Sequence, residues 1–242
     1  MRKQELDKII SRDANKIIAK LEPSTRNKLE TCRFSMGGKR ISLVYEGNLA
    51  KAMPIIRHAL SKCTKLLKPK RDITIIITNT TDDFITKKMG GVGGFTCNLS
   101  LIHLQINTRA RAWRNMLFSV ISHEFNHTVR FAIFNQETNL RGTMASEGLA
   151  QCFESEMSGR IPPWAKAISE SRAKTVWKEI IPNLSNRGWR IYIQVFFGGN
   201  RFPKWSGYTI SYLMVKKRLK DLKVDWSEAM RLRSEELIRS FD

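Results

Sequence analysis

Three residues in one short segment have the types and spacing of a metal site. The segment SVISHEFNHTVRF, residues 119–131, places His123, Glu124 and His127 in a run that otherwise has the apolar spacing of a buried helix. On an α-helix, positions 123 and 127 lie nearly on one face, about 6 Å apart, so both imidazoles can reach one ion. This HExxH pattern is typical of zinc sites in which the glutamate lies beside an open coordination position without binding the metal.

A catalytic zinc ion takes three protein ligands, so the pattern needs a further acidic or histidine residue that reaches the same face. Glu147, in the segment SEGLAQ, is the candidate, because 19 residues separate it from His127, enough for a turn and an antiparallel return. Gly148 would then allow the second helix to approach the first one closely, which offsets the cost of about 1 kcal/mol of a mid-helix glycine.

HExxH also occurs by chance in helices, with its polar side chains solvated or capping other groups. The apolar surroundings of residues 119–131 favour a metal, because burying an unpaired glutamate and two histidines carries a desolvation cost that coordination removes. A structural zinc site is a further alternative. It is disfavoured because the glutamate beside the three ligands would then have no function.

The elements that position these residues follow from the spacing of apolar side chains. The sequence predicts a long helix over residues 109–134 and a second one over 145–157, with a loop between them. Buried and half-exposed strands are predicted at 73–78 and 101–107, with a glycine-rich hairpin or lid at 90–94 before the second strand. Further helices are expected at 2–21, 48–67, 164–181, 209–221 and 226–240, and the aromatic segment between 182 and 208 is expected to be irregular.

These elements predict an α+β fold in which a small β-sheet precedes the HExxH helix and a mostly helical C-terminal part. The length of 242 residues fits a single domain. We expect residues 1–70 to form a helical N-terminal extension and residues 70–242 to form the core.

The chain carries 42 Lys and Arg against 22 Asp and Glu, a formal charge of +20, which favours acidic peptides, anionic surfaces or nucleic acid as partners. No helix-turn-helix, RNA-binding or zinc-finger pattern supports a nucleic-acid reader. The four cysteines form no CxxC pair, and no apolar segment approaches a membrane span or a signal core. A cytoplasmic, reducing location is therefore expected.

Three blocks in this order, SHEFNHTVRF, SEGLAQCFE and FPKWSGYTISYLMVKKRL, together resemble the YjaZ-like (DUF2268-type) family of predicted zinc-dependent proteases. In that family an HExxH helix is followed by an EGLA helix and then by a Gly-Tyr helix start. The resemblance covers roughly residues 70–240. HExxH with a glutamate on a following helix is also similar to the gluzincin, thermolysin-like metallopeptidases.

The resemblance implies a zincin-like fold, Zn²⁺ as the cofactor, His123, His127 and Glu147 as its ligands, and Glu124 as the catalytic glutamate. One position departs from the family pattern. Gln151, one turn after Glu147, stands where such proteins often have an acidic residue that holds a ligand histidine. A neutral amide can still accept an imidazole N–H, but it should raise the basicity of the ligand less.

The chemistry expected from these residues is hydrolysis of a peptide bond, with Glu124 moving a proton from water to the leaving amine. Strand 101–107 could pair with an extended peptide, which makes His103 and Gln105 on its polar face candidate substrate contacts. The oxyanion donor is either Tyr208, which could also be an aromatic core residue, or His103, which could also be an ordinary surface histidine.

A different class of function stays open at this point. The mixture of aromatic and basic residues could instead stack nucleic-acid bases, in a basic binding protein whose metalloprotease-like fold is inactive. Such a protein would bind nucleic acid in a strongly salt-dependent way, and this binding would survive Glu124→Gln.

Overall fold

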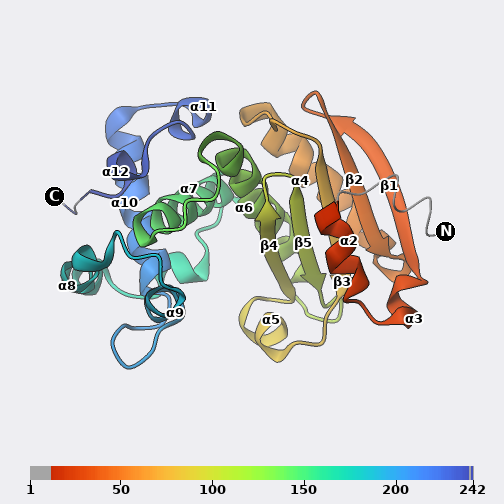
Figure 1. Cartoon of the computed structure of the whole chain (residues 1–242), viewed down its shortest axis with the longest axis horizontal. Helices are drawn as coiled ribbons and strands as arrows, with labels where there is room; N and C mark the ends of the chain where they lie inside the picture. Colours follow the sequence, from red (N-terminus) through yellow and green to blue (C-terminus); the bar gives the residue numbers. More distant parts are fainter. Residues whose placement is uncertain (1–11, 240, 242) are drawn as a thin grey trace. The chain divides into compact units, whose positions relative to one another are not determined.

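The computed structural model describes residues 12–239 and Phe241, and its chain divides into two units (Figure 1). The first unit extends to Ala132 and the second runs from Ile133 to the C-terminus. The boundary therefore falls near the end of the HExxH helix, whereas the sequence suggested one near residue 70.

A five-stranded mixed sheet forms the centre of the first unit, with the strand order β1-β2-β3-β5-β4. The strands are β1 (Leu29–Met36), β2 (Lys39–Glu46), β3 (Ile73–Asn79), β4 (Val92–Asn98) and β5 (Leu101–Ile106). β2, β3 and β5 are parallel to one another, while β1 pairs with β2 and β4 pairs with β5 in antiparallel fashion. The two strands predicted at 73–78 and 101–107 are both present.

The segment 1–70 is not a helical extension, because it supplies β1 and β2 to the sheet. A two-residue turn at Gly37 and Gly38 joins these strands, and both glycines have positive φ, +60° and +78°. This conformation suits the twist of a hairpin and is readily adopted by glycine. The helix predicted at 48–67 is present as α4 (Met53–Leu66), after the 3-10 helix η1 (Gly47–Ala52). Of the helix predicted at 2–21, residues 2–11 lie outside the described residues, and α2 (Arg12–Ala19) represents the rest.

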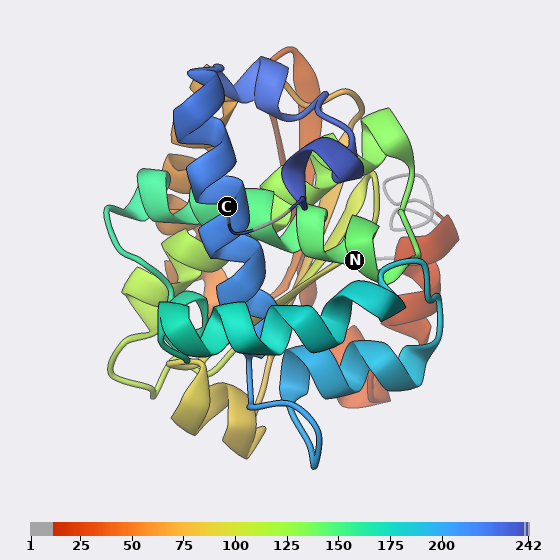
Figure 2. The ribbon, with the colours of Figure 1, turned by 90° about the vertical axis from the view of Figure 1, so that its left-hand side faces the viewer.

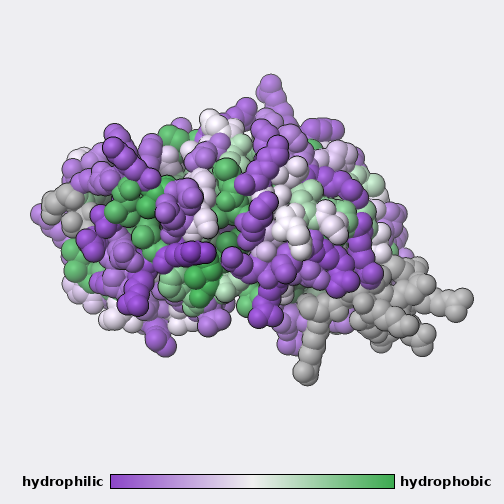
Figure 3. Space-filling view, turned by 90° about the horizontal axis from the view of Figure 1, so that it is seen from above, coloured by the Kyte–Doolittle hydropathy of each residue, from purple (hydrophilic) through white to green (hydrophobic). Residues whose placement is uncertain are grey.

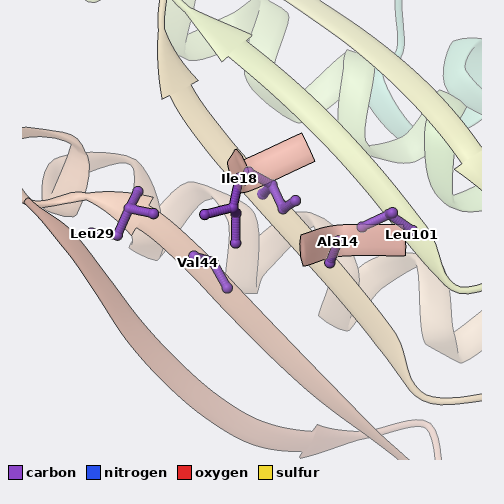
Figure 4. Packing of buried hydrophobic residues seen from close by; sticks show 6 residues of the cluster. Ala14, Ile18, Leu29, Val44 and Leu101 are labelled. Carbon is purple, nitrogen blue, oxygen red and sulfur yellow. The ribbon is translucent and has the colours of Figure 1, made fainter. Parts of the chain in front are cut away.

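Helices cover both faces of the sheet. α4 and α6 (Trp113–Phe134) pack against each other on one face, where the Cys63 thiol lies 3.5 Å from the Ser122 hydroxyl. On the opposite face, Ala14 and Ile18 of α2 pack against Val44 and Leu101 of the sheet (Figure 4). The central strand β3 is consequently buried on both sides, as its continuous run of isoleucines and threonines indicates.

The second unit is helical throughout its described elements. They are α7 (Leu140–Ser158), η2 (Pro163–Lys166), α8 (Glu170–Ile180), η3 (Ile181–Asn183), α9 (Trp189–Phe197), α10 (Ser206–Leu222), α11 (Trp226–Ala229) and α12 (Ser234–Leu237). α10 is the central helix, because it contacts α7, α8, α9 and η2, and Figure 2 shows it crossing α7. The helix expected at 164–181 is split into η2 and α8, the one expected at 226–240 is reduced to two short turns, and α9 lies in the segment that we expected to be irregular.

Gly148 has a different partner from the one that the sequence suggested. A Cβ atom at this position would lie 2.5 Å from Cγ2 of Val215 and 2.6 Å from the carbonyl oxygen of Ser211, both on α10. The glycine therefore allows α7 and α10 to cross closely. The prediction that Gly148 allows α7 to approach the HExxH helix is therefore wrong, because its close neighbours lie on α10.

Replacing Gly148 with alanine is expected to destabilise the protein. The methyl group improves helix propensity by about 1 kcal/mol, but it clashes with a backbone carbonyl that can move only with the whole helix. We expect a net loss of about 1–2 kcal/mol in the free energy of unfolding, measured by urea denaturation. Gly199→Ala is the matched control, because a Cβ there has no neighbour within 4 Å. Equal stability of the two variants would contradict this packing.

The face drawn in Figure 3 is mostly hydrophilic, with smaller hydrophobic areas between the polar ones. Within residues 12–239 and Phe241, no helix combines the length and the apolar character that crossing a lipid bilayer requires.

Candidate metal centre

His123 and His127 lie on α6, one helical turn apart, and face each other. Their Nε2 atoms are 3.1 Å apart, and their ring centroids are separated by 4.8 Å. The helix continues through both positions and ends at Phe134, followed by Asn135 in the left-handed region that often terminates helices. Phe131, one turn further on, stacks on the His127 ring at 5.5 Å and restricts its orientation.

The distance between the two imidazole nitrogens fits a tetrahedral zinc ion. Zinc binds nitrogen at about 2.0–2.1 Å, which places two nitrogen ligands about 3.3 Å apart at the tetrahedral angle. His123, His127 and Glu147 form a group in which each residue offers one ligand atom, and these atoms all lie within 4.8 Å of one another. Two histidines and a glutamate are a ligand set that zinc takes at catalytic sites, so this cluster could bind a metal.

α7 carries Glu147 and starts five residues earlier than the sequence suggested, at Leu140. Asn139 caps it, because its side-chain oxygen accepts a hydrogen bond of 2.8 Å from the backbone N–H of Gly142. This cap closes the turn after α6, so that only residues 135–139 separate the two helices.

Glu124 is buried, with only 7% of its surface exposed. Hydrogen bonds from the neighbouring strand β4 hold it in place. The hydroxyl of Thr96 donates to its Oε2 at 2.7 Å and lies 3.0 Å from its backbone carbonyl oxygen. Gly94, two residues before on the same face of β4, makes room for this side chain. A Cβ there would lie 2.7 Å from the Cγ of Glu124 and 2.5 Å from Val120.

Thr96 was not identified from the sequence. It is 28 residues away from Glu124 and belongs to no recognisable motif. Gly94 and Thr96 are two residues apart on a strand and therefore share a face. This spacing points to a role beside Glu124 only once β4 is known to pack against α6.

His103 and Gln105 lie on the face of the sheet opposite to Glu124. In the antiparallel pair of β4 and β5, Thr96 and Gly94 pair with Ile102 and Leu104, whereas His103 pairs with Phe95 and Gln105 with Gly93. Paired residues project to the same side of a sheet, so the alternation separates these two sets. His103 is partly buried, and its Nε2 lies 3.0 Å from the hydroxyl of Thr78. The prediction that His103 and Gln105 contact the substrate at this site is therefore wrong, because both lie on the other face of the sheet.

The burial of His103 predicts a pH-dependent stability. Burial lowers the pKa of His103 below its usual value of 6.5, so below about pH 6.5 the unfolded chain binds more protons than the folded one, and stability rises with pH through this window. Acidification from about pH 7 to about pH 5 should therefore cost the native protein stability that His103→Gln does not lose. Urea denaturation of both proteins across this range measures the effect. A stability difference that is constant with pH would contradict it.

The expectation that strand 101–107 pairs with a peptide is wrong. β5 is hydrogen-bonded on one side to β3 and on the other to β4, so its backbone groups are already paired. Among the described strands, β4 is the edge on this side of the sheet. Phe95 on β4 is 63% exposed, which is unusual for a large apolar side chain.

Gln151 and Tyr208 meet in the second unit. The side-chain amide nitrogen of Gln151 donates to the backbone oxygens of Glu147 at 3.2 Å and of Tyr208 at 3.1 Å. Gln151 thus ties the first turn of α10 to the turn of α7 that carries the acidic ligand candidate. The Tyr208 ring packs edge-on against Phe196, with centroids 4.9 Å apart, and its side chain is partly exposed.

A model of one protein family matches residues 53–239 of the chain, and this family is described as "Predicted Zn-dependent protease (DUF2268)". The match includes β3–β5 and all the candidate ligands. It also begins earlier than the resemblance expected at residue 70, at the start of α4.

Two curated proteins of Bacillus subtilis (strain 168) are similar in sequence. The uncharacterized protein YjaZ is 27% identical over 124 residues, 48% of this chain and 48% of that protein. The uncharacterized protein YjfC is 26% identical over 164 residues, 62% of this chain and 52% of that protein. The match thus spans about half the length of each relative.

Among solved structures, an aminopeptidase N family protein from Idiomarina loihiensis is similar with a TM-score of 0.48 and 15% sequence identity. This likeness covers 84% of the chain but 40% of that structure. It is too distant to assign an activity.

Proposed function

Since the chain belongs to the DUF2268 family of predicted zinc-dependent proteases, we propose that it is a zincin-like metallopeptidase with a gluzincin ligand set. His123, His127 and Glu147 would hold Zn²⁺, and the substrate would be a peptide or protein. The observation that carries this proposal is the convergence of these three ligand atoms within 4.8 Å; the buried Glu124 is next to His123 in the sequence.

A zinc ion bound there would act as a Lewis acid that polarises the scissile carbonyl and makes a water molecule more acidic. The other steps belong to the chain. Glu124 accepts a proton from the attacking water as the C–O bond forms, and passes it to the amide nitrogen as the C–N bond breaks. One water is consumed, and a carboxylic acid and an amine are released.

Thr96 has a positioning role in this proposal. The hydrogen bond from its hydroxyl to Oε2 fixes the orientation of the Glu124 carboxylate. A carboxylate held in one orientation loses less entropy in the reaction than one that rotates freely. The edge strand β4, which carries both Thr96 and Phe95, is the strand on which an extended substrate could pair by backbone hydrogen bonds.

Tyr208 is the remaining candidate for stabilising the oxyanion. It lies at the start of α10, and the Gln151 amide holds its backbone to the carbonyl of Glu147. A phenolic hydroxyl can donate to the negative oxygen that develops in the transition state. This supports its assignment as a catalytic residue together with Glu124.

The proposal is tested by zinc content and by hydrolysis, measured on the same preparation. Elemental mass spectrometry of protein purified without added metal should give near one zinc per chain. A library of quenched fluorescent peptides should show cleavage that a chelator abolishes and added zinc restores. A protein that takes up no zinc even on reconstitution would rule out the proposed site.

Removing the Thr96 hydroxyl is expected to slow the reaction without loss of the metal. Thr96→Val keeps the shape of the side chain but removes one hydrogen-bond donor from the buried Glu124 carboxylate, and we expect kcat to fall by about 10-fold to 100-fold. KM and zinc content should stay near the wild-type values, and Thr96→Ser should recover most of the rate. A variant that alters KM alone would contradict the positioning role.

A further inference from the structure

Helix α9 and the first turn of α10 carry a row of aromatic side chains, of which the proposed chemistry uses only Tyr208. The row consists of Trp189, Tyr192 and Phe197 on α9 and Tyr208 on α10. In Figure 2, α9 is the light blue helix at the lower right. Trp189 is 72% exposed and Phe197 is 39% exposed. The other side of α9, with Ile191 and Val195, is buried.

The rings of this row are in continuous contact. Trp189 stacks on Tyr192 with centroids 5.8 Å apart, Tyr192 contacts Phe197 at 5.9 Å, and Phe197 contacts Tyr208 at 6.3 Å. Single exposed apolar side chains are ordinary, but a contiguous row of large ones marks a binding surface. The row begins at the most exposed tryptophan and ends at Tyr208, the candidate oxyanion donor.

The stretch of sequence that contains the row is rich in basic residues. Residues 180–220 contain no Asp or Glu. They contain eight basic residues: Arg187, Arg190, Lys204, Arg201, Lys216, Lys217, Arg218 and Lys220. Arg187 and Arg190 flank Trp189 in sequence, and both are exposed. A ligand that covers Trp189 therefore lies close to positive charge, which attracts acidic groups.

The ring geometry favours a peptide over a nucleic acid. Stacking of successive bases requires aromatic faces that are open and roughly parallel. Only Trp189 and Tyr192 approach this, with an interplanar angle of 30°, whereas the angles are 68° between Tyr192 and Phe197 and 89° between Phe197 and Tyr208. Edge-to-face rings form an uneven apolar surface, which suits a bulky side chain better than a row of bases.

We propose that the aromatic row is a substrate subsite for peptides in which a large apolar residue is flanked by acidic residues. The apolar side chain packs on Trp189 and Phe197, and the carboxylates lie near Arg187 and Arg190. This inference rests on the proposed peptidase function and names its substrate class.

Binding without turnover tests the subsite directly. The zinc-loaded Glu124→Gln protein is titrated into a fluorescein-labelled octapeptide with one Phe between Asp and Glu residues, and anisotropy gives Kd. The same peptide with Ala in place of Phe should bind about tenfold more weakly. Adding Trp189→Ala should abolish this difference. Adding Phe84→Ala, which removes an aromatic side chain of similar exposure to Phe197 on another helix, should preserve it.

Equal Kd values for the Phe and Ala peptides, or a preference that survives Trp189→Ala, would overturn the subsite. So would tighter, Trp189-dependent binding of a labelled single-stranded oligonucleotide in the same assay. The two proposals fail separately. If the Phe peptide binds more tightly in a Trp189-dependent way but the wild type cleaves no peptide, the subsite is supported and the peptidase function is contradicted. If the wild type cleaves peptides but shows no such preference, the peptidase function is supported and the subsite is contradicted.

Discussion

Glu124→Gln is expected to abolish peptide hydrolysis while the zinc content of the protein remains near one per chain. Glutamine has almost the same shape as glutamate but cannot accept the proton of the attacking water. Loss of a general base costs about 10²–10⁴-fold in rate, so residual cleavage should be close to the background of the assay. Because Glu124 is not among the proposed ligands, its replacement removes proton transfer and leaves metal binding intact.

The buried position of Glu124 makes a control for folding necessary. The amide nitrogen of glutamine could face the Thr96 hydroxyl, which would still find an acceptor in the backbone carbonyl 3.0 Å away. We therefore expect an unchanged circular dichroism spectrum and a melting temperature near that of the wild type. Glu156→Gln, an exposed position on α7, should retain full activity. If Glu124→Gln still hydrolyses peptides at a rate near that of the wild type, the assigned mechanism is wrong.

The parts of the structure that follow from local sequence were the parts predicted well. The HExxH helix was expected at 109–134 and is present at Trp113–Phe134, because its apolar spacing and the lack of a breaker depend on neighbouring residues only. The same holds for β3, whose run of β-branched residues is typical of a strand buried on both faces.

One hairpin and one helix were missed although their local signals are present. Gly37-Gly38 between alternating residues is a typical hairpin turn, and it would have placed β1 and β2 in the segment that we expected to be helical. Trp189–Phe197 has apolar residues at helical intervals, but the surrounding glycines and aromatics suggested an irregular segment. In both segments the spacing of the residues indicates the element better than their composition does.

Contacts between distant segments could not be predicted. A mid-helix glycine indicates that something approaches closely, but the sequence does not say which helix, and Gly148 proved to face α10. The polar face of β5 was identified, but which face of the sheet receives the catalytic helix depends on tertiary packing. His103 therefore lies opposite to Glu124, and Thr96, which holds Glu124, was absent from the predicted site.

Glu147→Ala and His123→Ala are each expected to lose both zinc and hydrolysis. With two remaining ligands the ion has fewer protein donors than the three that catalytic zinc sites use. Structural or catalytic zinc binding also stabilises the folded chain by mass action, so the wild type should melt at a higher temperature when zinc is present than after chelation. This shift should disappear in both variants, which gives a readout that does not depend on activity.

The choice of controls separates loss of a ligand from loss of a fold. His103→Gln replaces a partly buried histidine on the opposite face of the sheet from Glu124, and Glu156→Gln replaces an exposed acid on the helix that carries Glu147. Both should keep near one zinc per chain. If Glu147→Ala retained zinc while His123→Ala lost it, the third ligand would have to be another residue, and the gluzincin assignment would fail while the histidine pair remained.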